Sequence, residues 1–345
     1  MHPYKEMFYV FKCGFNIIKR GIRNGYVLRT HEMYLENGVY INTINGDYIH
    51  EVSSYSKIGD KTYSSLSLNN GQCMFLLNVF TKIFRYKING NKKKKFCGTE
   101  LLLSSSGNEI KIFSKKKGLV MTCYKDKIKF LRSLDEKYYF SQYYDVPKTV
   151  EFDIDNKTVV ELLIPHHDYS VDNAFFYYCE RFSLYLQTNK DSIMYDIEED
   201  KKKLARFRDC VGPSKLLNHA IGLPKIVTHG DLWRSNIIYD GKNFYLIDFE
   251  KKGIRFFLFD FFCFIFSECY LLYNRNQLNF YLKGGYDEVL SKLFKEANSI
   301  YDKNLRETYF IAFLVEYSYE RWNTEKTSEI VSNFLKEYLP KYFLI

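Results

Sequence analysis

The chain has 345 residues, of which 46% are hydrophobic and 26% are charged. This balance is typical of a folded globular protein and excludes a wholly disordered chain, and the length is enough for about two domains. The net formal charge of +9 favours phosphate-bearing partners in general, without distinguishing nucleotides from anionic lipids or nucleic acids.

The eight cysteines form no CxxC pair, and their scatter through apolar segments is typical of a reducing compartment. The first residues lack the apolar core and cleavage site of a secretory signal. The most apolar stretch, Ile254–Tyr273, contains Arg255, Asp260 and Glu268, which would be costly in lipid, so it predicts a buried helix. We therefore expect a cytoplasmic protein without a membrane span, for which peripheral membrane contact stays open.

Residues 1–95 are predicted to be an N-terminal extension of unknown role. Asn-Gly pairs at 24–25, 37–38 and 45–46 mark turns between short runs such as Val39–Ile44, which indicates a small β-rich or mixed segment. Gln72–Tyr86 predicts a helix, and Lys92–Lys95 is typical of a solvated linker.

Residues 96–165 have a clearer pattern, and it predicts a small antiparallel sheet with one helix. The predicted strands are Thr99–Leu103, Glu109–Phe113, Leu119–Tyr124, Val150–Ile154 and Thr158–Ile164. The helix is expected over Ile128–Tyr143, where the apolar spacing is amphipathic and ends before Pro147.

Residues 166–345 are predicted to be mostly helical, interrupted by loops and short strands over 225–250. The predicted helices are Asn173–Gln187, Ile193–Phe207, Phe256–Tyr273, Tyr286–Ile300, Leu305–Trp322 and Thr327–Leu339. The expected fold class is therefore α+β, with a small β lobe, a larger helical lobe, and domains at 1–95, 96–165 and 166–345.

The segment that carries chemistry begins where a short strand, Ile226–Thr228, leads into His229, Gly230 and Asp231. Asn236 follows Asp231 by five residues. Next, Ile237–Tyr239 and Phe244–Ile247 predict a hairpin about Asp240-Gly241 that ends on Asp248.

A tight hairpin brings its outer ends together, so Asp248 is expected beside Asn236. A carboxylate and an amide oxygen are hard ligands suited to Mg²⁺. Asp231, at the start of the same loop, is placed to orient or deprotonate an attacking hydroxyl. Phosphoryl transfer needs this set of groups, because its catalysis is mainly positioning and charge neutralisation.

The pattern of His229, Asp231, Asn236 and Asp248 resembles that of the protein-kinase-like superfamily. The His-Gly-Asp form, together with Asp260 opening the next helix, is most similar to the branch of aminoglycoside phosphotransferases, choline kinases and lipopolysaccharide core sugar kinases. The resemblance implies a two-lobed kinase fold, ATP and Mg²⁺ as cofactors, Asp231 as catalytic base, and Asn236 and Asp248 as metal ligands. It also implies that His229 supports the catalytic loop, and Arg234 is the nearest cation for the γ-phosphate.

For the nucleotide, the resemblance implies a loop over the phosphates at Ser104–Gly107, including Ser105, Ser106 and Gly107. It also implies a lysine at the end of the third strand that pairs with a helix glutamate. Lys125 and Glu136 fit these positions, with Lys111 and Lys127 as alternatives for the lysine. Glu161–Pro165, including Glu161 and Leu163, would form the hinge whose backbone binds adenine.

The acceptor is expected to be small, because only eleven residues separate Asp248 from Asp260 and no polypeptide-docking segment follows. Candidate lining residues in the helical lobe are Glu250, Glu268, Glu316, Glu320 and Trp322. Without an acidic cluster, we expect a sugar or a surface-polysaccharide or lipopolysaccharide component. The alternatives are an aminoglycoside or choline-type acceptor, an amino alcohol, or a catalytically inactive kinase-like scaffold. No nucleic-acid-binding module is recognised.

Overall fold

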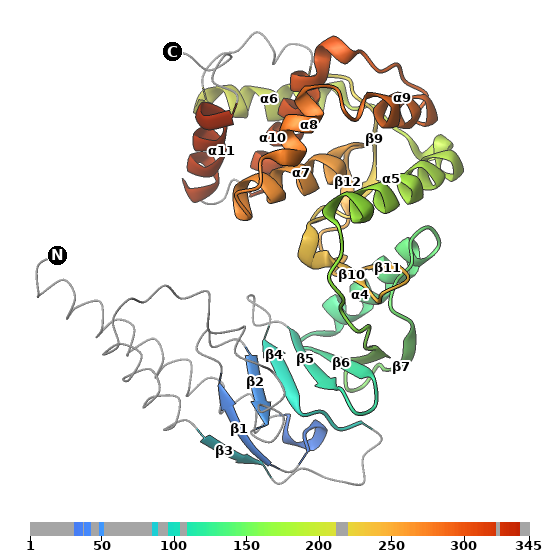
Figure 1. Ribbon diagram of the computed structural model, residues 1–345, viewed down its shortest axis with the longest axis vertical. Helices are drawn as coiled ribbons and strands as arrows, with labels where there is room; N and C mark the ends of the chain where they lie inside the picture. The colour runs from blue at the N-terminus through green and yellow to red at the C-terminus, as the bar shows by residue number, and fades with distance from the viewer. Residues whose placement is uncertain are drawn as a thin grey trace, which may run out of the picture. The chain divides into compact units, whose positions relative to one another are not determined.

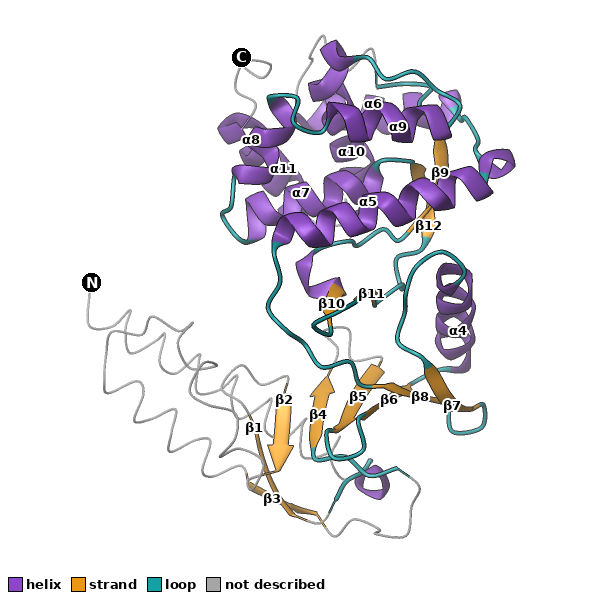
Figure 2. Cartoon of the chain, turned by 45° about the vertical axis from the view of Figure 1, so that its right-hand side comes forward, coloured by secondary structure: helices purple, strands orange, loops and turns teal. Residues whose placement is uncertain are grey.

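The computed structural model describes residues 31–36, 38–42, 48–51, 85–88, 96–103, 109–211, 220–321 and 325–338. It combines an eight-stranded antiparallel sheet and two two-stranded sheets with a set of α-helices (Figures 1 and 2), so the predicted α+β class is confirmed. The predicted Ser105, Ser106, Gly107 and Trp322 lie outside the described residues.

The chain divides into two compact units. The first runs up to Arg132 and also takes in Pro147–Ile164, and the second comprises Ser133–Val146 and Pro165–Ile345. The division therefore falls within helix α4, Lys127–Ser141. The finer division at residues 95 and 165 stays a prediction.

The first unit contains a sheet of eight strands in the order β3-β1-β2-β4-β5-β6-β8-β7. Five of them match the predicted strands: β4 (Glu100–Leu103), β5 (Glu109–Ser114), β6 (Leu119–Tyr124), β7 (Thr149–Asp153) and β8 (Thr158–Leu162). Leu101, Ile112 and Met121 of β4, β5 and β6 are buried in one cluster with Leu35 and Phe96. Short apolar runs bounded by turn residues were therefore a good guide to these strands.

The other three strands come from the N-terminal extension. They are β1 (Gly38–Asn42), β2 (Tyr48–Glu51) and β3 (Arg85–Ile88). β2 pairs with β4 through Tyr48 with Leu102 and Ile49 with Leu101, so the extension continues the sheet. The helix predicted over 72–86 lies mostly outside the described residues, but Arg85 and Tyr86 at its end belong to β3, where that prediction is wrong.

The second unit is built from helices around one core. They are α5 (Val171–Thr188), α6 (Ile197–Val211), α7 (Phe259–Leu271), α8 (Asn276–Leu282), α9 (Asp287–Glu296), α10 (Arg306–Arg321) and α11 (Glu325–Tyr338). Phe261, Phe262 and Phe310 are fully buried in this core.

The sequence prediction placed the start of the apolar helix too early. Residues 253–256 form strand β12 (Gly253–Phe256), which pairs with β9 (Lys225–Thr228), and α7 starts only at Phe259. Helix α8 was not predicted. α7 is buried nearly all round, as expected for a core helix, and no described helix is both long and apolar enough to cross a membrane.

Candidate active site

The loop after β9 is hydrogen-bonded to Asp260, the second residue of α7. Its Oδ2 accepts the N–H of His229 and its Oδ1 accepts the N–H of Gly230, each at 2.7 Å. The side chain is buried, and burial raises its pKa, while nearby His229 and the two N–H donors act in the opposite direction. Asp260 therefore fixes the turn that presents Asp231.

Gly230 is required at this turn because its backbone φ is 83° and its surroundings leave no space. A Cβ atom here would lie 2.3 Å from the carbonyl oxygen of Lys251 and 2.6 Å from Nη1 of Arg255. Arg255 is itself buried, and donates to Thr228 Oγ1 (3.0 Å), Lys251 O (2.8 Å) and Glu320 Oε1 (2.6 Å). It thus ties the strand before the loop to the segment after Asp248.

His229 joins the loop to the hairpin. Its Nε2 lies 2.9 Å from the carbonyl oxygen of Ile247, and its Nδ1 lies 3.3 Å from the N–H of Asp231. A carbonyl oxygen can only accept, so Nε2 carries the proton and Nδ1 accepts the Asp231 N–H. This tautomer makes His229 a bridge between the residue before Asp248 and the backbone of Asp231.

The predicted hairpin is confirmed: β10 (Ile237–Tyr239) pairs with β11 (Phe244–Leu246) in antiparallel register. The N–H of Ile247 donates to the carbonyl of Asn236 at 3.1 Å, so Asp248 follows the residue directly paired with Asn236. Asn236 is buried, and its Nδ2 donates to the carbonyl of Asp231 at 2.8 Å, which orients its Oδ1 as the group left for a ligand.

Asp248 has a left-handed backbone with φ of 68°, and its side chain is exposed. The next residue, Phe249, is buried and packs against Phe140 of α4 and against His229, with ring centroids 4.9 and 5.0 Å apart. This packing holds the backbone in a conformation that a non-glycine residue seldom adopts.

The guanidinium group of Arg234 is paired with a carboxylate of the protein. Its Nε and Nη2 donate to the two carboxylate oxygens of Glu268 at 3.0 and 2.6 Å. Glu268 is fully buried, and a buried carboxylate needs such a two-point partner. The pair explains the presence of Arg234 structurally, and a catalytic role for it stays a prediction.

Other proposed acceptor carboxylates are likewise paired with cations inside the second unit. Glu316 is buried, bonded to Lys203 at 3.2 Å and to the N–H of Phe256 at 2.7 Å, and burial raises its pKa. Glu320 pairs with Arg255 at 2.6 Å. Glu250 is exposed.

The predicted nucleotide residues are placed as follows. Lys125 is exposed and lies one residue beyond β6, Lys111 is 3.7 Å from Glu109, and Glu136 is buried on α4. Glu161 pairs with Val120 in the sheet, and the N–H of Leu163 already donates to Gly118 O at 2.9 Å. A Lys125–Glu136 pair and an adenine-binding role of Glu161 and Leu163 therefore stay predictions.

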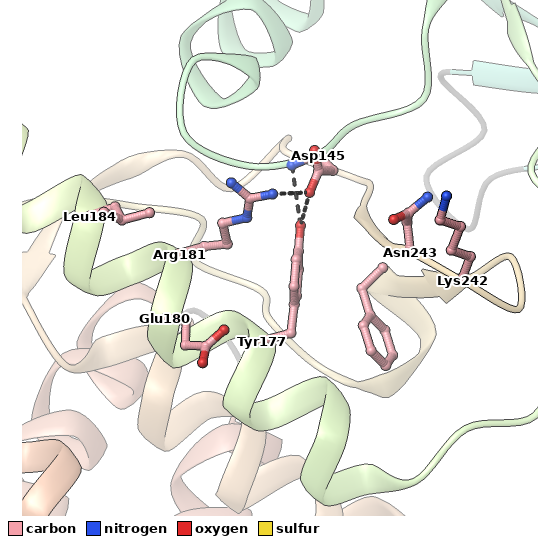
Figure 3. A pocket seen from close by; sticks show the side chains of 8 residues that line it. Asp145, Tyr177, Glu180, Arg181, Leu184, Lys242 and Asn243 are labelled. Carbon is pink, nitrogen blue, oxygen red and sulfur yellow. Dashed lines mark hydrogen bonds and ion pairs between the residues drawn. The ribbon is translucent and has the colours of Figure 1, made fainter.

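A pocket of ≈ 360 Å³ beside the hairpin is lined by residues of α5, the β10–β11 turn and Asp145 (Figure 3). Asp145 Oδ2 accepts from Tyr177 Oη at 3.0 Å and Arg181 Nη2 at 2.6 Å, and its carbonyl accepts from Leu246 N at 2.9 Å. No predicted site residue lines this pocket, so its described contacts serve to fasten β11 to α5.

The residue that sequence reasoning missed is Arg255. The only sign of its importance in the sequence is that a cation lies inside an apolar run. That charge argued against a membrane span, but the sequence did not indicate which residues Arg255 contacts. In the part of the chain that the structure describes, no group of three or more His, Cys, Asp and Glu side chains is gathered as for a metal ion.

Comparison with known families decides the class of this site. Residues 157–288, which include β9, the loop, the hairpin and α7, match the phosphotransferase enzyme family. The match covers 132 of the 345 residues, so it is a likeness of this segment to that family. The predicted resemblance is confirmed over these residues, and with it the predicted enzyme class, a phosphotransferase.

The chain matches no curated protein, but it is similar to several solved structures. Amicoumacin kinase hAmiN in complex with AMP-PNP, Ca²⁺ and Ami is 14% identical, with 70% of this chain and 88% of that chain covered and a TM-score of 0.39. Glucosamine kinase in complex with glucosamine, ADP and inorganic phosphate is 11% identical, with 70% and 82% covered and a TM-score of 0.41. Choline kinase LicA from Streptococcus pneumoniae is 13% identical, with 70% and 92% covered and a TM-score of 0.38. These likenesses are too distant to carry over a substrate.

Proposed function

We propose that this phosphotransferase moves the γ-phosphate of ATP, with Mg²⁺, to a hydroxyl of a small molecule. The observation that carries the proposal is the hydrogen-bonded path from Asp231 through Asn236 to Ile247, the residue before Asp248. Asn236 and Asp248 would hold the metal, which would neutralise the phosphate charges when bound. Asp231 would accept the proton of the attacking hydroxyl.

For the acceptor we propose a sugar or a surface-polysaccharide or lipopolysaccharide component. The ion pairs of Glu268, Glu316 and Glu320 support this choice. A cationic acceptor such as an aminoglycoside or choline would need carboxylates that are not already neutralised by Arg or Lys. A neutral, hydroxylated acceptor needs no such free carboxylate.

The test uses Mg·ATP alone as the probe, because slow transfer to water is measurable without the acceptor. Asp231→Asn should lower turnover about a hundredfold or more while Mg·ATP still binds in a calorimetric titration. Asp248→Asn should weaken Mg·ATP binding itself. Asp155→Asn, an exposed aspartate in the β7–β8 turn, is the matched control and should change neither. Equal turnover in Asp231→Asn and the parent would remove the proposed base.

A further inference from the structure

Tyr169 is the one residue of the stretch just before α5 that turns inward. Residues 165–170 have no regular secondary structure, and all of them except Tyr169 are exposed. The Tyr169 ring makes edge contacts with Tyr239 and Phe244 of the β10–β11 hairpin, with centroids 6.4 and 5.5 Å apart. The N–H of His167 also donates to the carbonyl of Tyr239 at 2.8 Å. This packing explains an aromatic ring at position 169, but a phenylalanine would supply it equally well.

The hydroxyl of Tyr169 makes contacts of its own, with two backbone carbonyls. Its Oη lies 2.8 Å from the carbonyl oxygen of Arg234 and 3.2 Å from that of Ile237. A carbonyl oxygen can only accept, so the hydroxyl is the donor and its one proton is shared between them. Partial burial raises the pKa of Tyr169 to about 12, although Arg234 acts in the opposite direction, so the hydroxyl keeps this proton at neutral pH.

The two carbonyls that Tyr169 contacts flank Asn236. Residues Arg234–Asn236 form a 3₁₀ turn, η5, at whose end the N–H of Ile237 also donates to the carbonyl of Arg234. Strand β10 begins at Ile237. The Tyr169 hydroxyl therefore lies where the turn passes into the hairpin, and it restrains the backbone on both sides of Asn236.

Asn236 has one polar atom left for a ligand. Its N–H donates to the carbonyl of Trp233 at 2.9 Å, and its carbonyl accepts from the N–H of Ile247 at 3.1 Å. Its Nδ2 donates to the carbonyl of Asp231 at 2.8 Å, whereas none of the described residues donates to its Oδ1. The side chain is otherwise enclosed, since the residue is only 4% exposed. The direction of Oδ1 thus depends on the backbone of η5, which Tyr169 holds.

We propose that Tyr169 is a positioning residue, and that its hydroxyl keeps Asn236 Oδ1 directed for the metal-bound nucleotide. This deepens the proposed function and rests on it, because there Asn236 is a metal ligand. Groups that hydrogen-bond behind a metal ligand orient it, and their removal lowers metal affinity. Loss of the hydroxyl should therefore weaken binding of Mg·ATP and leave binding of metal-free ATP unchanged.

The experiment is a calorimetric titration of the full chain with ATP, once with Mg²⁺ and once with EDTA. Tyr169→Phe keeps the ring and removes only the hydroxyl. It should lower the affinity for Mg·ATP about fivefold, the effect of one hydrogen bond, and should bind metal-free ATP as the parent does.

Tyr177→Phe is the matched control. It removes a hydroxyl that donates to Asp145 Oδ2 at 3.0 Å, and its ring contacts the same Phe244, with centroids 5.3 Å apart. This variant also loses one hydrogen bond beside the hairpin, but that bond does not reach the residues flanking Asn236. It should therefore bind ATP like the parent under both conditions, even if the two variants melt at equally lowered temperatures.

Hydrolysis of ATP gives a second readout. In Tyr169→Phe the Mg²⁺ concentration for half-maximal turnover should rise about fivefold, while kcat at saturating Mg²⁺ stays near that of the parent. Equal Mg·ATP affinity in Tyr169→Phe and the parent would overturn the positioning role, and so would an equal loss of affinity with Mg²⁺ and with EDTA. A parent that does not bind Mg·ATP at all would overturn the proposed function, and this role with it.

Discussion

At Gly230 two separate constraints act on one residue, the positive φ and the close approach of Lys251 and Arg255. Gly118, in the turn between β5 and β6, has a φ of 63° but no atom within 4 Å of where a Cβ would lie. The two glycines therefore distinguish backbone strain from steric contact.

Gly118→Ala should cost about 1 kcal/mol, the expense of placing an L-residue in the left-handed region. Gly230→Ala should cost about 3 kcal/mol, because the loop or Arg255 must also shift. Urea denaturation followed by circular dichroism measures both values. If both variants lose the same free energy of unfolding, the clash between a Cβ atom at position 230 and Lys251 O is relieved without destabilising the protein.

Residues with a fixed spacing could be placed in the fold from the sequence alone, whereas residues that act through distant partners could not. Asp231, Asn236 and Asp248 were predicted from a loop and a tight hairpin that fix their spacing; the hairpin is confirmed, and their roles stay predictions. Arg255 was missed because its partners, Thr228 and Glu320, are distant in sequence and follow no periodic pattern. Arg234 was noticed because it lies near Asp231 in the sequence, but its pairing with Glu268, 34 residues away, could not be predicted.

At the scale of elements, α9 and α10 are joined at their first residues. Asp287 opens α9 and accepts from Arg306 Nε at 2.7 Å, with a second contact through Arg306 Nη2, and Arg306 opens α10. The hydrogen bonds from Arg306 are the main cause of a lowered pKa for Asp287.

Asp287→Asn should therefore reduce the free energy of unfolding by about 1 kcal/mol at neutral pH, given that both side chains are partly exposed. A carboxyl group with a lowered folded-state pKa contributes stability above its unfolded pKa and loses it as the pH falls through the folded value. The difference between parent and variant should start to fall near the ordinary Asp pKa of 3.8 and disappear only once the pH is below the lowered folded-state pKa. Urea titrations across acidic pH measure it, and a difference that persists there would exclude the ion pair as its source.

Elements with strong periodicity were predicted well and mixed apolar segments were not. The five strands of residues 99–164 are short runs bounded by turn residues, and several of their apolar side chains form one buried cluster. Strand β12 was merged into a predicted helix, because both Gly253–Phe256 and α7 are rich in apolar residues and the pairing of β12 with β9 is not a local property.

At the scale of the whole molecule, the positive charge is unevenly distributed along the sequence. Residues 1–95 contain 15 Lys and Arg against 6 Asp and Glu, so they account for the entire net charge of +9. Residues 96–345 are balanced, with 35 of each sign. Any long-range attraction to polyanions should thus depend on the extension and weaken with salt.

Changing Lys92–Lys95 to glutamine removes four of these charges. The variant should elute from a heparin column at a lower salt concentration than the parent. A matched variant with four exposed lysines of the second unit changed, Lys201, Lys242, Lys251 and Lys292, should shift less. Equal shifts would mean that total charge, rather than its location in the extension, governs retention.

The pairing of β2 with β4 has a consequence for how this chain could have arisen. If the first 95 residues were removed, β4 would become an edge with its backbone N–H and C=O groups bare, a ready template for another molecule's strand. A shortened ancestor or a natural truncation would need some other cover for that strand, or it would self-associate. The strands of the extension therefore form the edge of the first unit's sheet and protect β4 from pairing with another chain.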